Sequence, residues 1–173
     1  MQTSTVTTTP DLDGQSAYPL WNVSFATDPL DGWLFEGAVT DGSIPAIARD
    51  SMLLRDAGSA VYEVEGLDLA RFSTLKVEAE GSAWSLEDGS DACVLSVSLD
   101  SFATTKVVLT IVDGSDNFSL VGGAARVTDQ GALWDSSTIV SLKFEASVDD
   151  FRDMCYLTSV SVSGYKSGSP SVA

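Results

Sequence analysis

The chain has 173 residues, which is enough for one domain with a core of its own. It carries 9 basic residues, 25 acidic residues and no histidine, and its net charge is −16. The lack of histidine excludes Ser-His-Asp and Cys-His catalysis and the usual zinc sites. The acidity argues against nucleic acid and anionic membrane surfaces as partners.

The first segment, residues 1–14, is rich in threonine and has no core-facing pattern. We expect an extended arm that becomes ordered against a partner, with Val6 and Leu12 as its small apolar anchors. The segment lacks the basic and apolar regions of a signal peptide. No apolar run in the chain is long enough for a membrane span.

Alternation of polar and apolar residues, which is typical of half-buried strands, recurs along the rest of the chain. One short helical turn fits 66–72, and loops are expected at 81–90 and 113–123, which are rich in Gly and Asp. Strands are predicted at 21–25, 33–36, 44–48, 51–55, 59–65, 75–79, 92–100, 106–112 and 125–128.

The clearest strand pattern lies in 139–164, where two strands flank an acidic link. Each strand buries one face, so a second sheet must cover it. We therefore predict an all-β fold, an antiparallel two-sheet β-sandwich that is jelly-roll-like, over residues 15–166, followed by a polar tail at 167–173. Its buried spine residues are predicted to be Val140, Leu142, Phe144, Val160 and Val162.

Three stretches resemble the jelly-roll modules found among carbohydrate-binding modules and accessory domains of secreted hydrolases. They are FATDPLDGW at 25–33, YEVEGLDLARFSTLKVEA at 62–79 and YLTSVSV at 156–162. The resemblance implies a jelly-roll sandwich and is compatible with two functions. One is glycan binding, and the other is a structural role in a viral particle, where decoration and tail proteins use the same fold.

These modules often carry an acidic residue shortly before the closing Val-x-Val, where it can hold structural calcium. This chain has Thr158 and Ser159 at that place. Leu157 and Val160 are three residues apart, so a bulge near Thr158 is predicted to turn both inward.

Other acidic residues could supply oxygen ligands to calcium. None of them fits the twelve-residue calcium loop, so we interpret them as solvated turn residues and expect no cofactor, with structural calcium left open. They are Asp28, Asp31 and Glu36; Asp149, Asp150 and Asp153; and Asp88 and Asp91.

The two cysteines, Cys93 and Cys155, fall in predicted strands. We expect buried free thiols, which behave as small apolar groups. A disulfide is the alternative if the two strands neighbour or face one another.

Trp84 and Trp134 are candidates for stacking on a sugar ring, because each is predicted in a loop near carboxylates. The alternative is that the two rings cap the ends of the sandwich core. Two pairs of alternating acids, Glu63 with Glu65 and Glu78 with Glu80, are candidates for glycoside hydrolysis, but each pair also fits the solvent face of a strand. We therefore expect no enzymatic activity.

Two functions remain. The first is a non-catalytic structural protein of a phage particle, at the virion surface, with homo-oligomeric and other particle-protein partners. It could be a capsid decoration (cement) protein or a tail or fibre component. The alternative is the carbohydrate-binding module of an extracellular protein, with a glycan as partner. The lack of a signal peptide and the arm favour the first.

Overall fold

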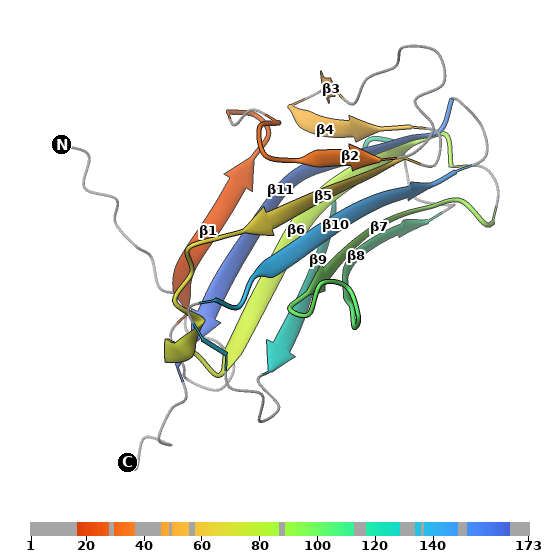
Figure 1. Cartoon of the computed structure of the whole chain (residues 1–173). Coiled ribbons are helices and arrows are strands. Elements are labelled where there is room, and N and C mark those ends of the chain that lie inside the picture. Colours follow the sequence, from red (N-terminus) through yellow and green to blue (C-terminus); the bar gives the residue numbers. More distant parts are fainter. Residues whose placement is uncertain are drawn as a thin grey trace, which may run out of the picture.

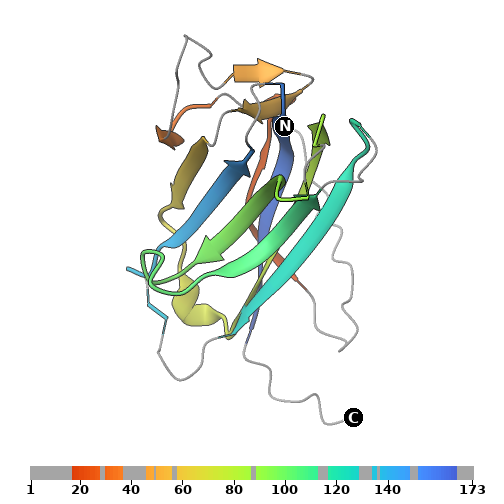
Figure 2. The same ribbon diagram turned by 90° about the vertical axis from the view of Figure 1, so that its right-hand side faces the viewer.

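The computed structural model describes most of the chain as a layered β-structure (Figures 1 and 2). The predicted arm with Val6 and Leu12, and the tail at 167–173, lie outside the described residues and stay predictions. The described residues are 17–27, 30–36, 46–48, 50–55, 58–86, 89–112, 117–128, 134–135, 137–148 and 152–166.

The described strands form two antiparallel sheets that face each other, which confirms the predicted jelly-roll-like sandwich (Figure 1). The six-stranded sheet has the order β3-β4-β11-β6-β9, and β1 also pairs with β11. Its strands are β1 (Tyr18–Ser24), β3 (Ala46–Ala48), β4 (Ser51–Leu54), β6 (Thr74–Trp84), β9 (Val121–Thr128) and β11 (Met154–Tyr165). The five-stranded sheet has the order β2-β5-β10-β7-β8. Its strands are β2 (Leu34–Glu36), β5 (Ser59–Val64), β7 (Ala92–Ser98), β8 (Lys106–Val112) and β10 (Val140–Ser147).

The two strands of the predicted spine, β10 and β11, lie in different sheets, each with neighbours on both sides. Their inward residues form the centre of the core, as predicted, and are almost completely buried: Val140, Leu142, Phe144, Val160 and Val162. The register of β11 against β6 shifts between Leu157 and Ser159, and both Leu157 and Val160 are buried. The predicted bulge near Thr158 is therefore confirmed.

Two predicted loops were wrong in part. β6 continues through Gly81 to Trp84, and β9 begins at Val121, so residues assigned to loops belong to strands. Gly81 has no side chain, so it interrupts the alternation of polar and apolar residues from which the strand was predicted. The sheet requires a glycine at this position, because a Cβ would lie 2.6 Å from the backbone oxygen of Tyr156. The predicted helical turn is confirmed as the short 3₁₀ helix η1 (Leu69–Arg71).

Cys93 and Cys155 form a disulfide, so the expectation of free thiols was wrong. Cys93 lies in β7 of the five-stranded sheet and Cys155 in β11 of the six-stranded sheet, and both are fully buried. The physical reason is that the two strands face each other across the core, which strand prediction alone did not establish. The bond joins the two layers of the sandwich covalently.

Candidate functional site: a polar groove on the six-stranded sheet

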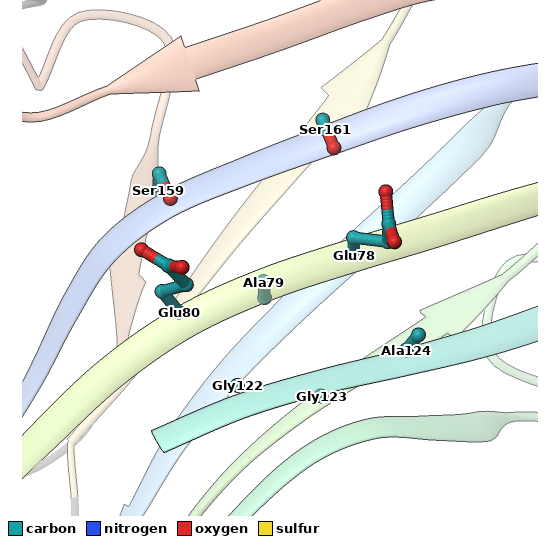
Figure 3. Close-up of a pocket in the computed structure, with 8 residues that line it drawn as sticks. All are labelled: Glu78, Ala79, Glu80, Gly122, Gly123, Ala124, Ser159 and Ser161. Carbon is teal, nitrogen blue, oxygen red and sulfur yellow. The ribbon is translucent and has the colours of Figure 1, made fainter. Parts of the chain in front are cut away.

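The outer face of the six-stranded sheet carries an open groove of about 630 Å³ (Figure 3). Strand register builds it from two rows that cross β11, β6 and β9. One row is Ser161–Glu78–Ala124, and the next is Ser159–Glu80–Gly122. Because alternate residues of a strand share a face, all six point away from the core.

The groove has one polar side and one small-residue side. Figure 3 shows the carboxylates of Glu78 and Glu80 beside the hydroxyls of Ser159 and Ser161. β9 contributes only glycine and alanine to the lining, so no large side chain fills that side. Carboxylates accept hydrogen bonds and serine hydroxyls both donate and accept, so this surface suits a ligand rich in hydroxyl groups.

Glu78 is partly engaged within the protein. The Lys76 ammonium lies 2.8 Å from a Glu78 carboxylate oxygen. That hydrogen bond is the main cause of a raised pKa at Lys76, so the lysine stays charged beside the groove. Glu80 lies two residues further along β6, opposite Ser159 of β11.

Two adjacent glycines of β9 face opposite ways and should respond oppositely to substitution. Gly122 faces the groove, and a Cβ there would meet nothing within 4 Å. At Gly123 a Cβ would collide with the backbone carbonyl of Val108 in β8, where the two sheets approach closely. We expect Gly123→Ala to cost about 1–3 kcal/mol of unfolding free energy, the usual range for overpacking.

Gly122→Ala is the matched control and should change the unfolding free energy by less than about 1 kcal/mol, because the added methyl enters open space. Urea unfolding of both variants measures the difference. Equal stability of the two would contradict the close approach of β8 and β9 at Gly123.

Trp84 ends β6 on the same face as the groove, so its predicted place in a loop was wrong. Its ring stacks on Phe118 at 4.7 Å between centroids, and the rings of Phe118 and Tyr156 meet edge to face at 5.6 Å between centroids. The backbone N–H of Phe118 donates to the carbonyl of Ala83, which holds this aromatic cluster against β6. Trp84 remains 38% exposed and lies about 13 Å along β6 from Glu80, four residues at the rise of a strand.

Trp134 lies elsewhere and has a different environment. It is only 9% exposed and packs in the hydrophobic core. It also lines a second depression, of about 450 Å³, with Asp100, Lys106 and Thr138. That depression adjoins the Thr128 end of β9, whereas Trp84 lies near the Val121 end, so the structure does not bring the two tryptophans together.

Sequence reasoning missed most of the groove. The sequence indicates Glu78 and Glu80 only as a solvent face or a catalytic pair, and it places Ser159 where similar modules often carry an acidic residue. Ser161 is simply a polar residue between Val160 and Val162. Glycoside hydrolysis needs two carboxyl groups on either side of the bond that breaks. Here both carboxylates stand on one strand, and the described residues across from them are serine, glycine and alanine. Among the described residues, the lining of the groove offers no carboxyl group opposite Glu78 and Glu80.

The acidic residues considered for calcium are scattered or lie outside the description. Asp28, Asp88, Asp149 and Asp150 are not among the described residues. Asp31 and Glu36 are exposed, while Asp91 and Asp153 are buried. Within the described ranges, no group of three or more acidic or cysteine side chains is arranged to hold a metal ion. Structural calcium stays a prediction.

Asp100 fixes the turn between β7 and β8. Its carboxylate accepts hydrogen bonds from the Thr104 hydroxyl at 2.6 Å, the Thr104 backbone N–H at 2.8 Å and the Ser98 hydroxyl at 2.7 Å. These bonds, led by those from Thr104, favour the ionised form and hold the pKa of Asp100 below its usual 3.8.

We expect a carboxyl-carbon NMR titration to give Asp100 a midpoint below 3.8, and Thr104→Val to move it back toward that value. Because the folded pKa is depressed, the stabilisation is fully present above the unfolded pKa and is lost as pH falls through the folded one. A midpoint at or above 3.8 would contradict the hydrogen bonds that define this turn.

Comparison with known proteins shows the fold. No family model and no curated protein matches the sequence. Among solved structures, the chain is similar to the xylan-binding module CBM15, with a TM-score of 0.56 and 11% identity over 86% of this chain and 99% of that one. It is also similar to the CBM22-1 xylan-binding domain of Paenibacillus barcinonensis Xyn10C, with a TM-score of 0.53 and 12% identity over 88% and 97% of the two chains.

A viral structure also shares the fold. The enzymatically active domain of bacteriophage CBA120 tailspike protein 4 has a TM-score of 0.51 and 11% identity, over 82% of this chain and 20% of that one. Within the described residues, no helix has the length and apolar character needed to cross a bilayer. At these identities the likeness establishes a jelly-roll sandwich of the type found in carbohydrate-binding modules, and it establishes the fold alone.

Proposed function

We propose that the chain is a non-catalytic glycan-binding module that holds its ligand in the groove on the six-stranded sheet. The observation that carries the proposal is the groove itself, an open surface with hydroxyl and carboxylate side chains on one side and an empty position at Gly122 on the other. Trp84, exposed on the same face, supplies an aromatic platform at one end.

The ligand class follows from charge. Glu78 and Glu80 line the groove, and the whole chain carries −16, so a sulfated or uronate-rich glycan would be repelled. A neutral, hydroxyl-rich glycan would not be repelled. Two modules of the same fold are described as xylan-binding, which makes a xylan chain the first ligand to test.

The site of action is proposed to be extracellular. A buried disulfide between the sheets is typical of proteins that fold in oxidising compartments. Several structures with the same fold are carbohydrate-binding modules, while one is a phage tailspike domain. These likenesses support the glycan-binding alternative better than a structural role in a viral particle.

Xylohexaose and soluble xylan are the probes, and isothermal titration calorimetry with affinity electrophoresis measures their binding. Gly122→Leu should weaken binding at least about tenfold, because its side chain occupies the groove, and a loss of about 1.4 kcal/mol is enough for that. Gly89→Leu is the matched control, since a Cβ at Gly89 also meets nothing within 4 Å but the residue does not line the groove. No binding by the unmodified chain, or equal binding by both variants, would overturn the proposal.

Trp84→Ala and Glu80→Gln separate the two halves of the proposed site. Trp84→Ala should weaken binding of long oligosaccharides more than short ones, because the ring lies beyond the end of the polar groove. Glu80→Gln removes a charged acceptor and should weaken both lengths alike. A Trp84→Ala variant that binds every length normally would confine the site to the polar groove.

A further inference from the structure

A third depression, which we call the β5-edge cleft, lies at the side of the sandwich. It has a volume of about 440 Å³ and is lined by Trp21, Gly32, Leu34 and residues 61–65. Consecutive residues of a strand point to opposite faces, yet five in a row line this cleft. The lining therefore follows the edge of β5 rather than either face of the sheet.

Among the described strands, none pairs with this edge of β5 beyond Val61, because β2 is too short to reach further. β2 pairs with β5 only at Ser59, Ala60 and Val61. From Tyr62 to Val64, the only strand that pairs with β5 among the described residues is β10, on the other side. Figure 1 shows β2 accompanying one part of β5 only. The cleft occupies the place that a longer β2 would fill, and an uncovered strand edge is a template for an added strand.

The side chains along this edge differ between the two faces of β5. On the inner side, Tyr62 stacks on Trp21 with ring centroids 5.2 Å apart and contacts Trp33 at 5.1 Å. The turn backbone at Gly32 also lies against the ring, since a Cβ there would come within 2.8 Å of it. On the outer side, Glu63 and Glu65 are exposed. One strip is therefore aromatic and the other is negatively charged.

We propose that the β5-edge cleft binds an extended, basic peptide segment of another protein, which pairs with β5 as an added strand. Its backbone hydrogen-bonds to the open edge at 62–64. Alternate apolar side chains contact Trp21 and Tyr62, and the intervening lysine or arginine side chains pair with Glu63 and Glu65. Leu34, which is 68% exposed, borders the same cleft and gives the peptide a further apolar contact.

A peptide fits this cleft better than a glycan does. The open edge presents backbone donors and acceptors at the spacing of a β-strand, which an extended peptide matches along its whole length. The nearest lysine on the adjoining strand, Lys143, lies opposite Val61 and is ion-paired with Glu145 at 3.0 Å. It therefore leaves the acidic strip beside the edge to an incoming cation. The glycan groove lies on the outer face of the other sheet, so both ligands can bind at once.

The probe is a short fluorescent peptide of alternating valine and lysine, and fluorescence anisotropy measures its binding to the full chain. Two control peptides test the pairing. One has the same residues in separate valine and lysine blocks, and the other is N-methylated at consecutive positions, so that neither edge of the peptide can pair as a strand. Both should bind at least about tenfold more weakly, a loss of about 1.4 kcal/mol.

On the protein side, Glu63→Lys should weaken the alternating peptide about tenfold, consistent with a lost charge-assisted contact plus repulsion. Glu36→Lys is the matched control, since it makes the same charge change at an exposed position on β2 beyond the cleft, and it should have less than about a twofold effect. Amide signals of residues 62–65 should shift with the peptide and not with xylohexaose. Absence of binding, equal binding of the block peptide, equal effects of the two substitutions, or shifts at 62–65 caused by xylohexaose would each overturn the proposal.

Discussion

Phe144→Ala should lower the free energy of unfolding by about 3–5 kcal/mol, the range for truncating a large core aromatic. Phe144 is completely buried in β10, with β5 paired on one side and β7 on the other. Its removal leaves a cavity at the centre of the sandwich that two disulfide-linked layers cannot easily close. Chemical denaturation followed by tryptophan fluorescence measures the loss.

Leu120→Ala is the control for Phe144→Ala. Leu120 is 64% exposed, so its truncation should change the unfolding free energy by less than about 0.5 kcal/mol. A Phe144→Ala variant as stable as the Leu120→Ala variant would mean that β10 does not form the centre of the core.

The core was predictable because one physical signal determines it. Strict alternation in β10 identifies Val140, Leu142 and Phe144, since a register shift of one residue would turn these apolar side chains out of the core. The bulge at Thr158 was predictable for the same reason, because Leu157 and Val160 must both be buried. The burial of apolar side chains therefore makes these core positions predictable from the sequence.

The groove was not predictable in this way, because it is made of residues that avoid the core. Ser159 and Glu80 lie side by side only because β11 shifts its register at the bulge, and that pairing is non-local. Gly122 gives no hydrophobic signal, and it was assigned to a loop. The polar residues of an alternating pattern are predicted to face solvent, but the pattern does not predict which strands are neighbours in the sheet.

The aromatic residues show the same limit. The sequence does not distinguish Trp84 from Trp134, because both lie near acidic residues. In the fold, Trp84 is exposed on a sheet face and Trp134 is packed in the core. No sequence pattern pairs Trp21 with Tyr62, although the two rings stack between the two sheets. Ring environment depends on contacts between distant strands, which a single sequence does not specify.

Loss of the disulfide between Cys93 and Cys155 should lower the free energy of unfolding by about 4 kcal/mol, the chain-entropy value for a loop of this size. The two cysteines are 62 residues apart, and the bond keeps the unfolded chain compact. That is a large part of the 5–15 kcal/mol that stabilises a typical domain. Guanidinium unfolding of the oxidised and fully reduced protein measures the difference.

Two further observations separate the cross-link from the packing of its sulfur atoms. The denaturant slope m should rise on reduction, because the unfolded chain then exposes more surface, whereas Phe144→Ala should leave m unchanged. The double variant Cys93→Ala with Cys155→Ala should match the reduced protein in m and be somewhat less stable, because it also lacks two buried sulfur atoms. Mass spectrometry shows whether reduction is complete. If the completely reduced protein keeps the denaturation midpoint and the m of the oxidised protein, the disulfide does not stabilise the sandwich by restricting the unfolded chain.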